Sequence, residues 1–358
     1  MIDGYGTGSG TGLESPPLTR WTILDIAREA KVSKTTVSRV LNGRPDVDAE
    51  TSARVLKLID DVGYVRSAKA LQLANGRANA VGLLAPFDTS PWMIEVLRGA
   101  MDKVHSTSFN LMLHAFPETP TDEARLANEL QSGAMDALLV VSLQRPLDAV
   151  ERAAADGLPV VLLNDYGFNA GLGDIVPDET VGIAAAVDHL VEVGRRQFAI
   201  IVGATGNPVT DTRLAAYRSA LAAHGIGLDE GLTAGADFTA PGAQAATAGL
   251  IARGVPFDAL FASSDAMAVG AMRALKQSGR SIPGDVSVVG FDDFASAEFT
   301  EPRLTTVHNP LYEMSMRAVV RALDAVSARK PVVPGQEVVK THLIIRDSSD
   351  PRAKSGAA

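Results

Sequence analysis

The chain of 358 residues contains no cysteine. This absence excludes disulfide bonds, cysteine metal ligands and cysteine nucleophiles. No segment approaches the ~20 uninterrupted apolar residues that a membrane-spanning helix needs. Residues 1–19 lack the basic and apolar regions of a signal peptide and form a Gly/Ser/Thr-rich, flexible tail. We therefore expect a cytoplasmic protein without a membrane segment.

Signatures of common enzymes are also missing. The sequence has no nucleophile elbow, no P-loop and no dinucleotide-binding glycine fingerprint. Asp292 and Asp293 form a carboxylate pair that an enzyme could use. His189 and His308 have no partner at a metal-binding spacing, so structural roles are expected for both. We predict that the protein is not an enzyme, has no catalytic residues and needs neither a cofactor nor a metal.

The net charge of -9 is unevenly distributed along the chain. Residues 20–77 contain 11 basic and 7 acidic side chains, whereas residues 78–358 contain 22 basic and 33 acidic ones. A small basic segment on a large acidic body is typical of a DNA-binding head attached to a ligand-sensing core. Chance variation in local charge is the alternative explanation.

The hydrophobic pattern changes near Val81. Residues 22–64 show the spacing of short helices, and the later part alternates apolar runs with helix-length segments. The predicted strands are 80–85, 109–115, 137–141, 159–163, 198–203, 259–262 and 286–290. The predicted helices between them include 91–107, 121–132, 180–194, 210–224 and 265–279. Near-continuous apolar strands separated by helices predict parallel sheets covered on both faces.

Residues 22–43 predict two helices joined by a tight turn. The inner face of the first helix is expected to consist of Leu24, Ile26, Ala27 and Ala30. Ser33 can cap the second helix, whose apolar side chains Val37, Val40 and Leu41 pack back onto the first. The outer face of the second helix presents Lys34, Thr35, Thr36, Ser38, Arg39 and Asn42. These side chains can contact base edges or phosphates; an ordinary helical hairpin with a solvated polar face is the alternative.

The segment TILDIAREAKVSKTTVSRVLNG (residues 22–43) resembles the helix-turn-helix of the LacI/GalR family of bacterial transcription regulators almost residue for residue. The resemblance implies that the outer-face residues, together with Thr22, bind DNA. Lys31 departs from the glycine that the family favours in the turn, and a left-handed lysine there costs about 1 kcal/mol. A third helix is predicted over Asp48–Val62, and Gly63 ends it.

Residues 65–79 correspond to the family's hinge, which becomes helical on operator DNA and inserts a pair of leucines into the minor groove. By position the leucine is Leu73, with Ala70 nearby and Lys69 and Arg77 beside the DNA backbone. The family's Pro-Asn is replaced by Arg66-Ser67, which weakens the start signal of the hinge helix. An amphipathic linker with a buried Leu73 is the alternative.

Residues 80–347 resemble the family's effector domain, which shares its fold with periplasmic sugar-binding proteins. Segments such as SPWMIEVLRGA and IPGDVSVVGFDD carry the resemblance. The expected fold is a small all-α helix-turn-helix head on an α/β, two-lobed, periplasmic-binding-protein-like core with parallel sheets. The expected organisation is a tail (1–19), a head (20–64), a hinge (65–79), a first lobe (80–177 and 306–330), a second lobe (178–305 and 331–347) and a tail (348–358).

Ligands of parallel α/β sheets bind at the carboxyl ends of the strands. The strand ends and an adjacent helix start present Phe87, Asp88, Trp92, Asn164, Arg213, Phe238, Ser264, Phe291 and Asp292 as candidate effector-binding residues. The resemblance implies this role for Asn164, Arg213, Phe238, Ser264 and Asp292, although the family often has Asn at position 264. Carboxylates, an amide and a guanidinium can hold hydroxyls, and aromatic rings can stack on a sugar. Alternatives are a surface role for Arg213, core packing for Trp92, packing of Phe291 between the lobes without ligand contact, and simple helix capping for Asp265.

These features predict a repressor that binds palindromic double-stranded operator DNA as a homodimer. A small polar effector then releases the repressor from the operator. The polarity of the expected site favours a sugar as this effector. A dimer is favoured because no leucine heptads follow Asp347. The alternative is a co-repressor-type regulator that senses a nucleoside, a purine or a sugar phosphate. A free periplasmic binding protein would have a signal peptide and no use for residues 22–43.

Overall fold

The computed structural model describes residues 21–64, 77–86, 91–142, 147–165 and 171–350. The chain divides into two compact units, residues 1–76 and residues 77–358. We call the described part of the first unit the head and the second unit the core.

The head consists of α1 (Ile23–Glu29), α2 (Lys34–Leu41) and α3 (Ala49–Asp61). Each helix begins after a polar residue whose side chain accepts a backbone N–H of the first turn: Thr22, Ser33 and Asp48. Such caps satisfy amide groups that have no partner within the helix. Lys31 has a φ of 54°, which confirms the left-handed turn expected between α1 and α2.

The head has a small hydrophobic cluster at its centre that is closed to solvent. Ile26, Val37 and Val55, one from each helix, are fully buried and pack in one cluster. The prediction that Leu24 faces inward is wrong, because Leu24 is 57% exposed. Residues 26, 27 and 30 already fill the side of α1 that meets the other two helices.

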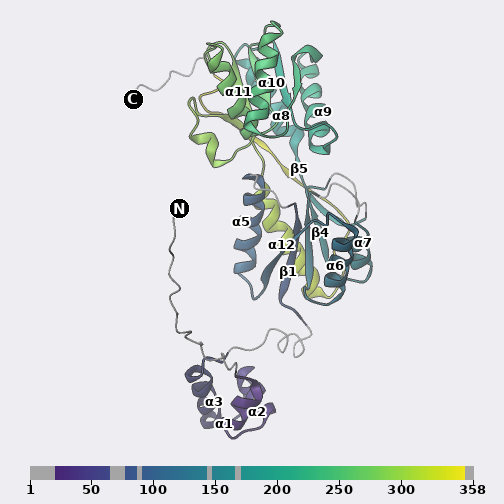
Figure 1. The fold of residues 1–358 in the computed structure, drawn as a ribbon, viewed down its shortest axis with the longest axis vertical. Coiled ribbons are helices and arrows are strands. Elements are labelled where there is room, and N and C mark those ends of the chain that lie inside the picture. The colour runs from purple at the N-terminus through teal and green to yellow at the C-terminus, as the bar shows by residue number, and fades with distance from the viewer. Residues whose placement is uncertain (1–20, 65–76, 87–90, 143–146, 166–170, 351–358) are drawn as a thin grey trace, which may run out of the picture. The chain divides into compact units, whose positions relative to one another are not determined.

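The first sheet of the core has the order β11-β5-β4-β3-β1-β2, with all neighbouring strands parallel. Its strands are β1 (Ala80–Ala85), β2 (Asn110–Ala115), β3 (Ala137–Val141), β4 (Val160–Leu163), β5 (Gly173–Asp178) and β11 (Gly335–Lys340). Helices α5 (Pro91–His105) and α12 (Leu311–Ala328) cover one face, and α6 (Pro120–Gln131) and α7 (Asp148–Ala155) cover the other (Figure 1). Alternate residues of β1 enter the two cores: Val81 and Leu83 face α5 and α12, and Ala80 and Leu84 face α6 and α7.

The second sheet repeats this design with the order β12-β10-β9-β8-β6-β7. Its strands are β6 (Phe198–Val202), β7 (Thr233–Gly235), β8 (Ala259–Ala262), β9 (Ser287–Asp292), β10 (Thr305–His308) and β12 (His342–Ile344). Helices α10 (Ala240–Ala252) and α11 (Asp265–Gln277) cover one face, and α8 (Glu179–Glu192) and α9 (Pro208–Ala223) cover the other. Two short 3-10 helices, η1 (Glu230–Leu232) and η2 (Ala295–Glu298), complete this lobe. Only β12 runs antiparallel, along β10, within the described pairings.

The expected lobe boundaries near the C-terminus need correction. Residues 335–340 form β11, which pairs with β5 in the first sheet, whereas the sequence predicts residues 331–347 in the second lobe. Residues 306–308 belong to β10 in the second sheet, whereas the sequence predicts them in the first lobe. β11 is an edge strand with mostly exposed side chains, so its sequence lacks the apolar pattern that marks the buried strands. None of the described helices is both long and apolar enough to cross a membrane.

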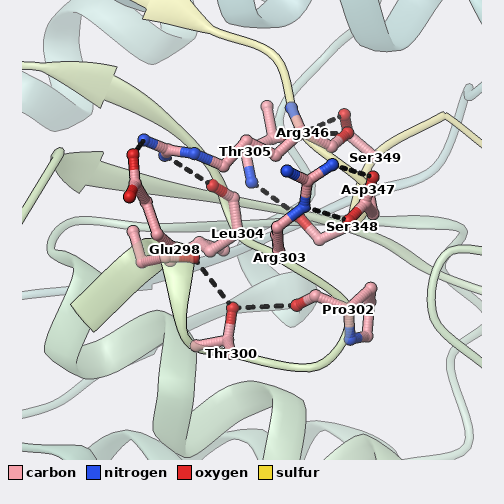
Figure 2. Close-up of polar contacts among 11 residues, drawn as sticks. Glu298, Thr300, Pro302, Arg303, Leu304, Thr305, Arg346, Asp347, Ser348 and Ser349 are labelled. Carbon is pink, nitrogen blue, oxygen red and sulfur yellow. Dashed lines mark hydrogen bonds and ion pairs between the residues drawn. The ribbon is translucent and has the colours of Figure 1, made fainter. Parts of the chain in front are cut away.

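The predicted C-terminal tail begins too early, because Ser348 and Ser349 are fully buried in the second lobe. Figure 2 shows this segment beside Thr305, whose backbone N–H donates to Ser348 Oγ at 2.8 Å and whose hydroxyl meets Ser349 Oγ at 2.7 Å. Ser348 Oγ also donates to the Val288 carbonyl at 2.7 Å. Small hydroxyl side chains can enter a buried site because these bonds satisfy them.

We expect Ser348→Ala to lower the free energy of unfolding of the core by about 2–4 kcal/mol, because it leaves two buried backbone groups without their partner. Arg303→Ala is the control, since it removes the exposed ion pair with Asp347 that is also visible in Figure 2. An exposed pair of this kind contributes about 1 kcal/mol or less. The stabilities of the two variants are compared by thermal unfolding. Equal losses of stability would contradict the role given to Ser348.

Candidate functional site

The outer surface of α2 carries the predicted DNA-contacting residues. Lys34, Thr35, Arg39 and Asn42 are exposed, whereas Thr36 and Ser38 are partly buried. This arrangement arises because Val37 and Val40 occupy the opposite side of α2 and are buried in the head core. The structure therefore places the predicted set on one helix and its flanking cap.

Two of the predicted hydroxyls already take part in helix capping, one as the cap itself and one as a partner of the cap. Thr36 Oγ1 lies 2.8 Å from Ser33 Oγ, the capping atom of α2. Thr22 Oγ1 donates to Asp25 Oδ2 at 2.7 Å, and the Asp25 backbone N–H donates back to Thr22 Oγ1 at 3.3 Å. These contacts set the start of each helix, so part of the polarity predicted for DNA binding also shapes the head.

Arg39 has an ionic partner that its local sequence does not reveal. Asp46, in the loop before α3, lies 3.3 Å from the Arg39 guanidinium, and both side chains are 53% exposed. An exposed ion pair contributes only about 0–1 kcal/mol, so a phosphate or a base can replace Asp46 at little cost.

Five predicted site residues lie outside the described ranges: Lys69, Ala70, Leu73, Phe87 and Asp88. Arg77, which is expected beside the DNA backbone, donates to the Val326 carbonyl in α12 at 3.1 Å in this structure without DNA.

In the second lobe, three charged side chains meet at the carboxyl ends of the strands. Arg213, on α9, donates from Nε and Nη2 to Glu179 Oε1 at 3.0 and 2.8 Å. Its Nη2 also lies 3.7 Å from Asp292 Oδ1, at the end of β9. Glu179, Arg213 and Asp292 are 3%, 6% and 8% exposed, so this is a nearly buried group, called here the 179–213–292 cluster. The alternative of a surface cation at Arg213 is therefore wrong.

Glu179 was not among the predicted residues. It is the first residue of α8 and directly follows β5, so it too lies at a strand end. The signal that could have found it is the position of Asp178-Glu179 between a strand and a helix. That signal is weak, because acidic residues commonly occupy the first turn of a helix simply to complement its dipole.

Burial and charge together control Asp292. The pKa of its carboxyl is raised to about 6. Removal from water is the largest cause and the Glu179 carboxylate adds to the rise, whereas the Arg213 guanidinium and the Asn309 amide lower the pKa. Asn309 Nδ2 donates to Asp292 Oδ1 at 3.3 Å. Asp292 is therefore largely ionised at neutral pH, but only because positive and hydrogen-bonding groups hold it so.

The aromatic candidates have different environments. Phe291 is fully buried in the second-lobe core, and the Arg213 guanidinium lies 3.7 Å from its ring centroid. Phe291 thus packs within the second lobe, rather than between the lobes as the alternative proposed, and its ring lies against the Arg213 guanidinium. The Phe238 ring is partly buried and lies against Gly203, where an added Cβ would come within 2.0 Å of it. Trp92 packs against the core of the first lobe as a partly buried side chain.

Ser264 and Asp265 position the start of α11. Ser264 Oγ accepts the Met267 N–H at 3.2 Å as the helix cap. Asp265 is fully buried and accepts from Phe294 N at 2.8 Å and from Thr306 Oγ1 at 2.5 Å. The alternative that Asp265 simply caps the helix is therefore wrong, because Ser264 is the cap, and Asp265 instead holds the backbone that follows Asp292.

The first sheet has its own polar strand ends. Asn164 follows β4, is 8% exposed and donates from Nδ2 to Ser142 Oγ at 3.0 Å. Ser142 follows β3 and was also missed. Since the carboxyl ends of parallel strands meet at one edge of a sheet, these two side chains mark the edge of the first sheet that corresponds to the 179–213–292 cluster in the second.

Several non-glycine residues near these strand ends have a positive φ angle. Asn164, Phe238, Asp292 and Asp293 have φ values of 59°, 63°, 111° and 62°. Non-glycine residues adopt positive φ at a cost of order 1–3 kcal/mol, and such residues concentrate at ligand sites. The combined geometry offers buried amide, carboxylate and guanidinium groups that can hold hydroxyls, and no group of three metal-ligating side chains occurs within the described residues.

Comparison with known proteins places these two units in one class. Residues 22–67 match the family model described as bacterial regulatory proteins, lacI family, and residues 187–349 match a periplasmic binding protein-like domain. The transcriptional regulator AscG of Escherichia coli is 32% identical over 84% of this chain and 91% of its own length. The transcriptional regulator CelR of Thermobifida fusca is 33% identical over 92% of this chain and 98% of its own length.

Solved structures of related proteins support the same class. A structure of a CelR–cellobiose complex is 31% identical, has a TM-score of 0.69 and covers 92% of this chain and 100% of its own. The lac repressor dimer bound to operator covers 92% of this chain and 99% of its own with a TM-score of 0.83, and at 23% identity it supports the fold alone. The head and core define a transcription regulator with a periplasmic-binding-protein-like domain. The chain belongs to the LacI family of bacterial regulatory proteins.

The environment of Asp265 predicts a pH-dependent stability. Burial and the neighbouring Asp292 carboxylate raise the pKa of Asp265 from its ordinary value near 3.8 to about 8. The folded state therefore favours the protonated carboxyl, and the stability that this group contributes is complete below pH 4 and is lost as the pH rises to about 8.

Asp265→Asn, which stays neutral, should unfold at a temperature that falls less between pH 5 and pH 8 than that of the unsubstituted protein. One pKa unit corresponds to about 1.4 kcal/mol, so a relative gain on the order of a few kcal/mol is expected at pH 8. Asp237→Asn is the control, because hydrogen bonds from Thr239 keep the pKa of that exposed carboxyl below its usual range. Identical slopes for Asp265→Asn and the unsubstituted protein would show that Asp265 is ionised in the fold.

Proposed function

We propose that this protein is a cytoplasmic repressor that binds a roughly palindromic operator as a homodimer and is released by a small sugar. The observation that carries the proposal is the polar face of α2, which is exposed while the opposite face of the helix packs in the hydrophobic cluster of the head. A recognition helix must present such side chains to base edges without losing its packing. The relatives named above support the effector class, because one solved CelR structure is described as a cellobiose complex.

The head has the chemistry for sequence readout. Arg39 can pair with guanine in the major groove, and Lys34, Thr35 and Asn42 can contact neighbouring bases or phosphates. The Ser33 and Thr22 caps fix the register of α2 and α1, so the reading face is preorganised. Leu73, with Lys69 and Ala70, remains the proposed minor-groove wedge of the hinge.

The effector is proposed to bind at the polar strand ends of the core. Asn164, Arg213, Ser264 and Asp292 would hold hydroxyl groups, and Phe238 would stack on the ring face. Phe87, Asp88 and Trp92 would complete the site from the first lobe, with Phe291 supporting Arg213. A ligand held by both lobes favours one arrangement of the core over another, and that preference is the free energy that can separate paired hinges from DNA.

Arg39→Ala should weaken binding to a preferred operator by about 1–3 kcal/mol, which is roughly tenfold to a hundredfold, because a base contact is lost. The operator is first selected from random double-stranded DNA with the unsubstituted protein, and affinities are then measured by gel shift against selected and scrambled duplexes. The selected sequence should be palindromic. Arg28→Ala is the charge-matched control, since the Arg28 side chain is 80% exposed on α1. Unchanged discrimination in Arg39→Ala would remove Arg39 from the reading face.

Asp292→Asn should keep operator binding and lose at least tenfold in affinity for a sugar, because an amide accepts fewer hydroxyls than a carboxylate. A thermal-shift panel of sugars provides the measurement, since a ligand of the folded state raises its melting temperature. Arg213→Ala is a poorer test, because it leaves Glu179 buried without its cation at a cost of about 3–5 kcal/mol. A normal sugar response in Asp292→Asn would contradict the proposed site.

A further inference from the structure

The charge of the 179–213–292 cluster is unbalanced. Two carboxylates, from Glu179 and Asp292, face one guanidinium, from Arg213. All three side chains are more than nine-tenths buried, so water screens their charges poorly. With both carboxylates ionised, the cluster carries a net charge of −1.

At least three of the five N–H donors of Arg213 are already engaged with the protein. Nε and Nη2 donate to Glu179 Oε1, and Nη1 donates to the Ser263 carbonyl at 2.5 Å. The fork of N–H groups with which an arginine ordinarily binds a phosphate or a carboxylate bidentately is thus directed at the protein itself. An anionic ligand that bound the Nε–Nη2 fork of Arg213 would have to displace Glu179 from a buried ion pair.

Acceptors, by contrast, are in surplus. Glu179 Oε2 and Asn309 Oδ1 are buried and make no hydrogen bond to any of the described residues. A buried acceptor without a donor costs about 1–3 kcal/mol, so a ligand that supplies hydroxyl donors recovers free energy here. A phosphate dianion supplies none.

The helix starts at this edge do not offset the imbalance. Helix N-termini attract anions, but the first residue of α8 is Glu179 and the first residue of α11 is Asp265. The positive end of α8 is therefore met by the Glu179 carboxyl group, and at the start of α11 the Met267 N–H is already bound by the Ser264 hydroxyl. Of the other charged groups nearby, Asp293 is paired with His308 at 3.0 Å and with Arg346 at 2.7 Å.

We propose that Glu179 is a specificity-determining residue that makes this site select uncharged, hydroxyl-rich ligands and reject phosphorylated ones. It acts by occupying the donors of Arg213 and by adding a second negative charge beside Asp292. The inference rests on the proposed function, that is, on ligand binding at these strand ends, and it narrows the effector to an unphosphorylated sugar.

The test compares matched probes on the full-length protein at pH 7.5: glucose with glucose 6-phosphate, ribose with ribose 5-phosphate, cellobiose, and inorganic phosphate. Calorimetric titration and thermal shift give the ratio of affinities within each pair. The unsubstituted protein should bind the neutral member of a pair or cellobiose, and should bind no phosphorylated probe more tightly than its neutral partner.

The variant Glu179→Gln should move the neutral-to-phosphate ratio by about tenfold or more toward the phosphorylated probes, because one buried negative charge is removed. Glu179→Asp, which keeps the charge, should preserve the original preference. Glu192→Gln makes the same charge change at the other, exposed end of α8 and should leave the ratio unchanged. Operator binding by each variant confirms that it is folded.

The outcomes are distinguishable. Equal or tighter binding of a sugar phosphate by the unsubstituted protein overturns the inference and leaves the proposed sugar-sensing function standing, and this arm needs no variant to fold. An unchanged ratio in a folded Glu179→Gln variant overturns the role of Glu179 alone. Binding of no probe by a protein that still binds its operator overturns the proposed sugar effector, and the inference with it.

Discussion

The buried ion pair between Arg213 and Glu179 is the interaction on which the polar edge of the second lobe depends. It joins α8 to α9, places the guanidinium over Phe291 and brings Asp292 within reach of a positive charge. Two carboxylates could not share this buried space without that cation, since desolvation of an unpaired charge costs several kcal/mol. The chemistry of the site is therefore set by charge balance rather than by any single residue.

The strand ends carry a second constraint, which is backbone geometry. Asp292 and Asp293 both have positive φ, and the Asp265 side chain accepts the Phe294 N–H immediately beyond them. A buried acid and a strained turn both cost folding free energy, which the packing of the surrounding residues has to offset. Placing functional groups on such turns, beside rigid strands, limits how far they move before a ligand arrives, and that preorganisation favours binding.

The head and the core solve different physical problems. The head closes a minimal apolar centre around Ile26, Val37 and Val55, which leaves one face of α2 free to remain polar and exposed. The core instead buries polar groups and holds many of them in hydrogen bonds, such as Ser348 and Ser349 near the end of the described chain, while Glu179 Oε2 and Asn309 Oδ1 keep no partner among the described residues. A LacI-family regulator needs both designs, because DNA is read from an exposed surface, whereas a small ligand is recognised by groups withdrawn from water.

Periodicity, capping residues and motif order in the sequence were sufficient to predict the three-helix head and the alternating buried strands, since these features arise from local geometry, whereas the left-handed Lys31 was expected from the family resemblance. The family assignment and the roles expected for Arg213 and Asp292 also came from the sequence. Only the tertiary structure revealed Glu179, Asp46 and Asn309 as partners, the place of β11 in the first sheet and the burial of Ser348. The physical reason is that an acidic residue at a helix start or a polar edge strand has the same local pattern whether or not it meets a distant partner, and that partner is decided by how the chain packs.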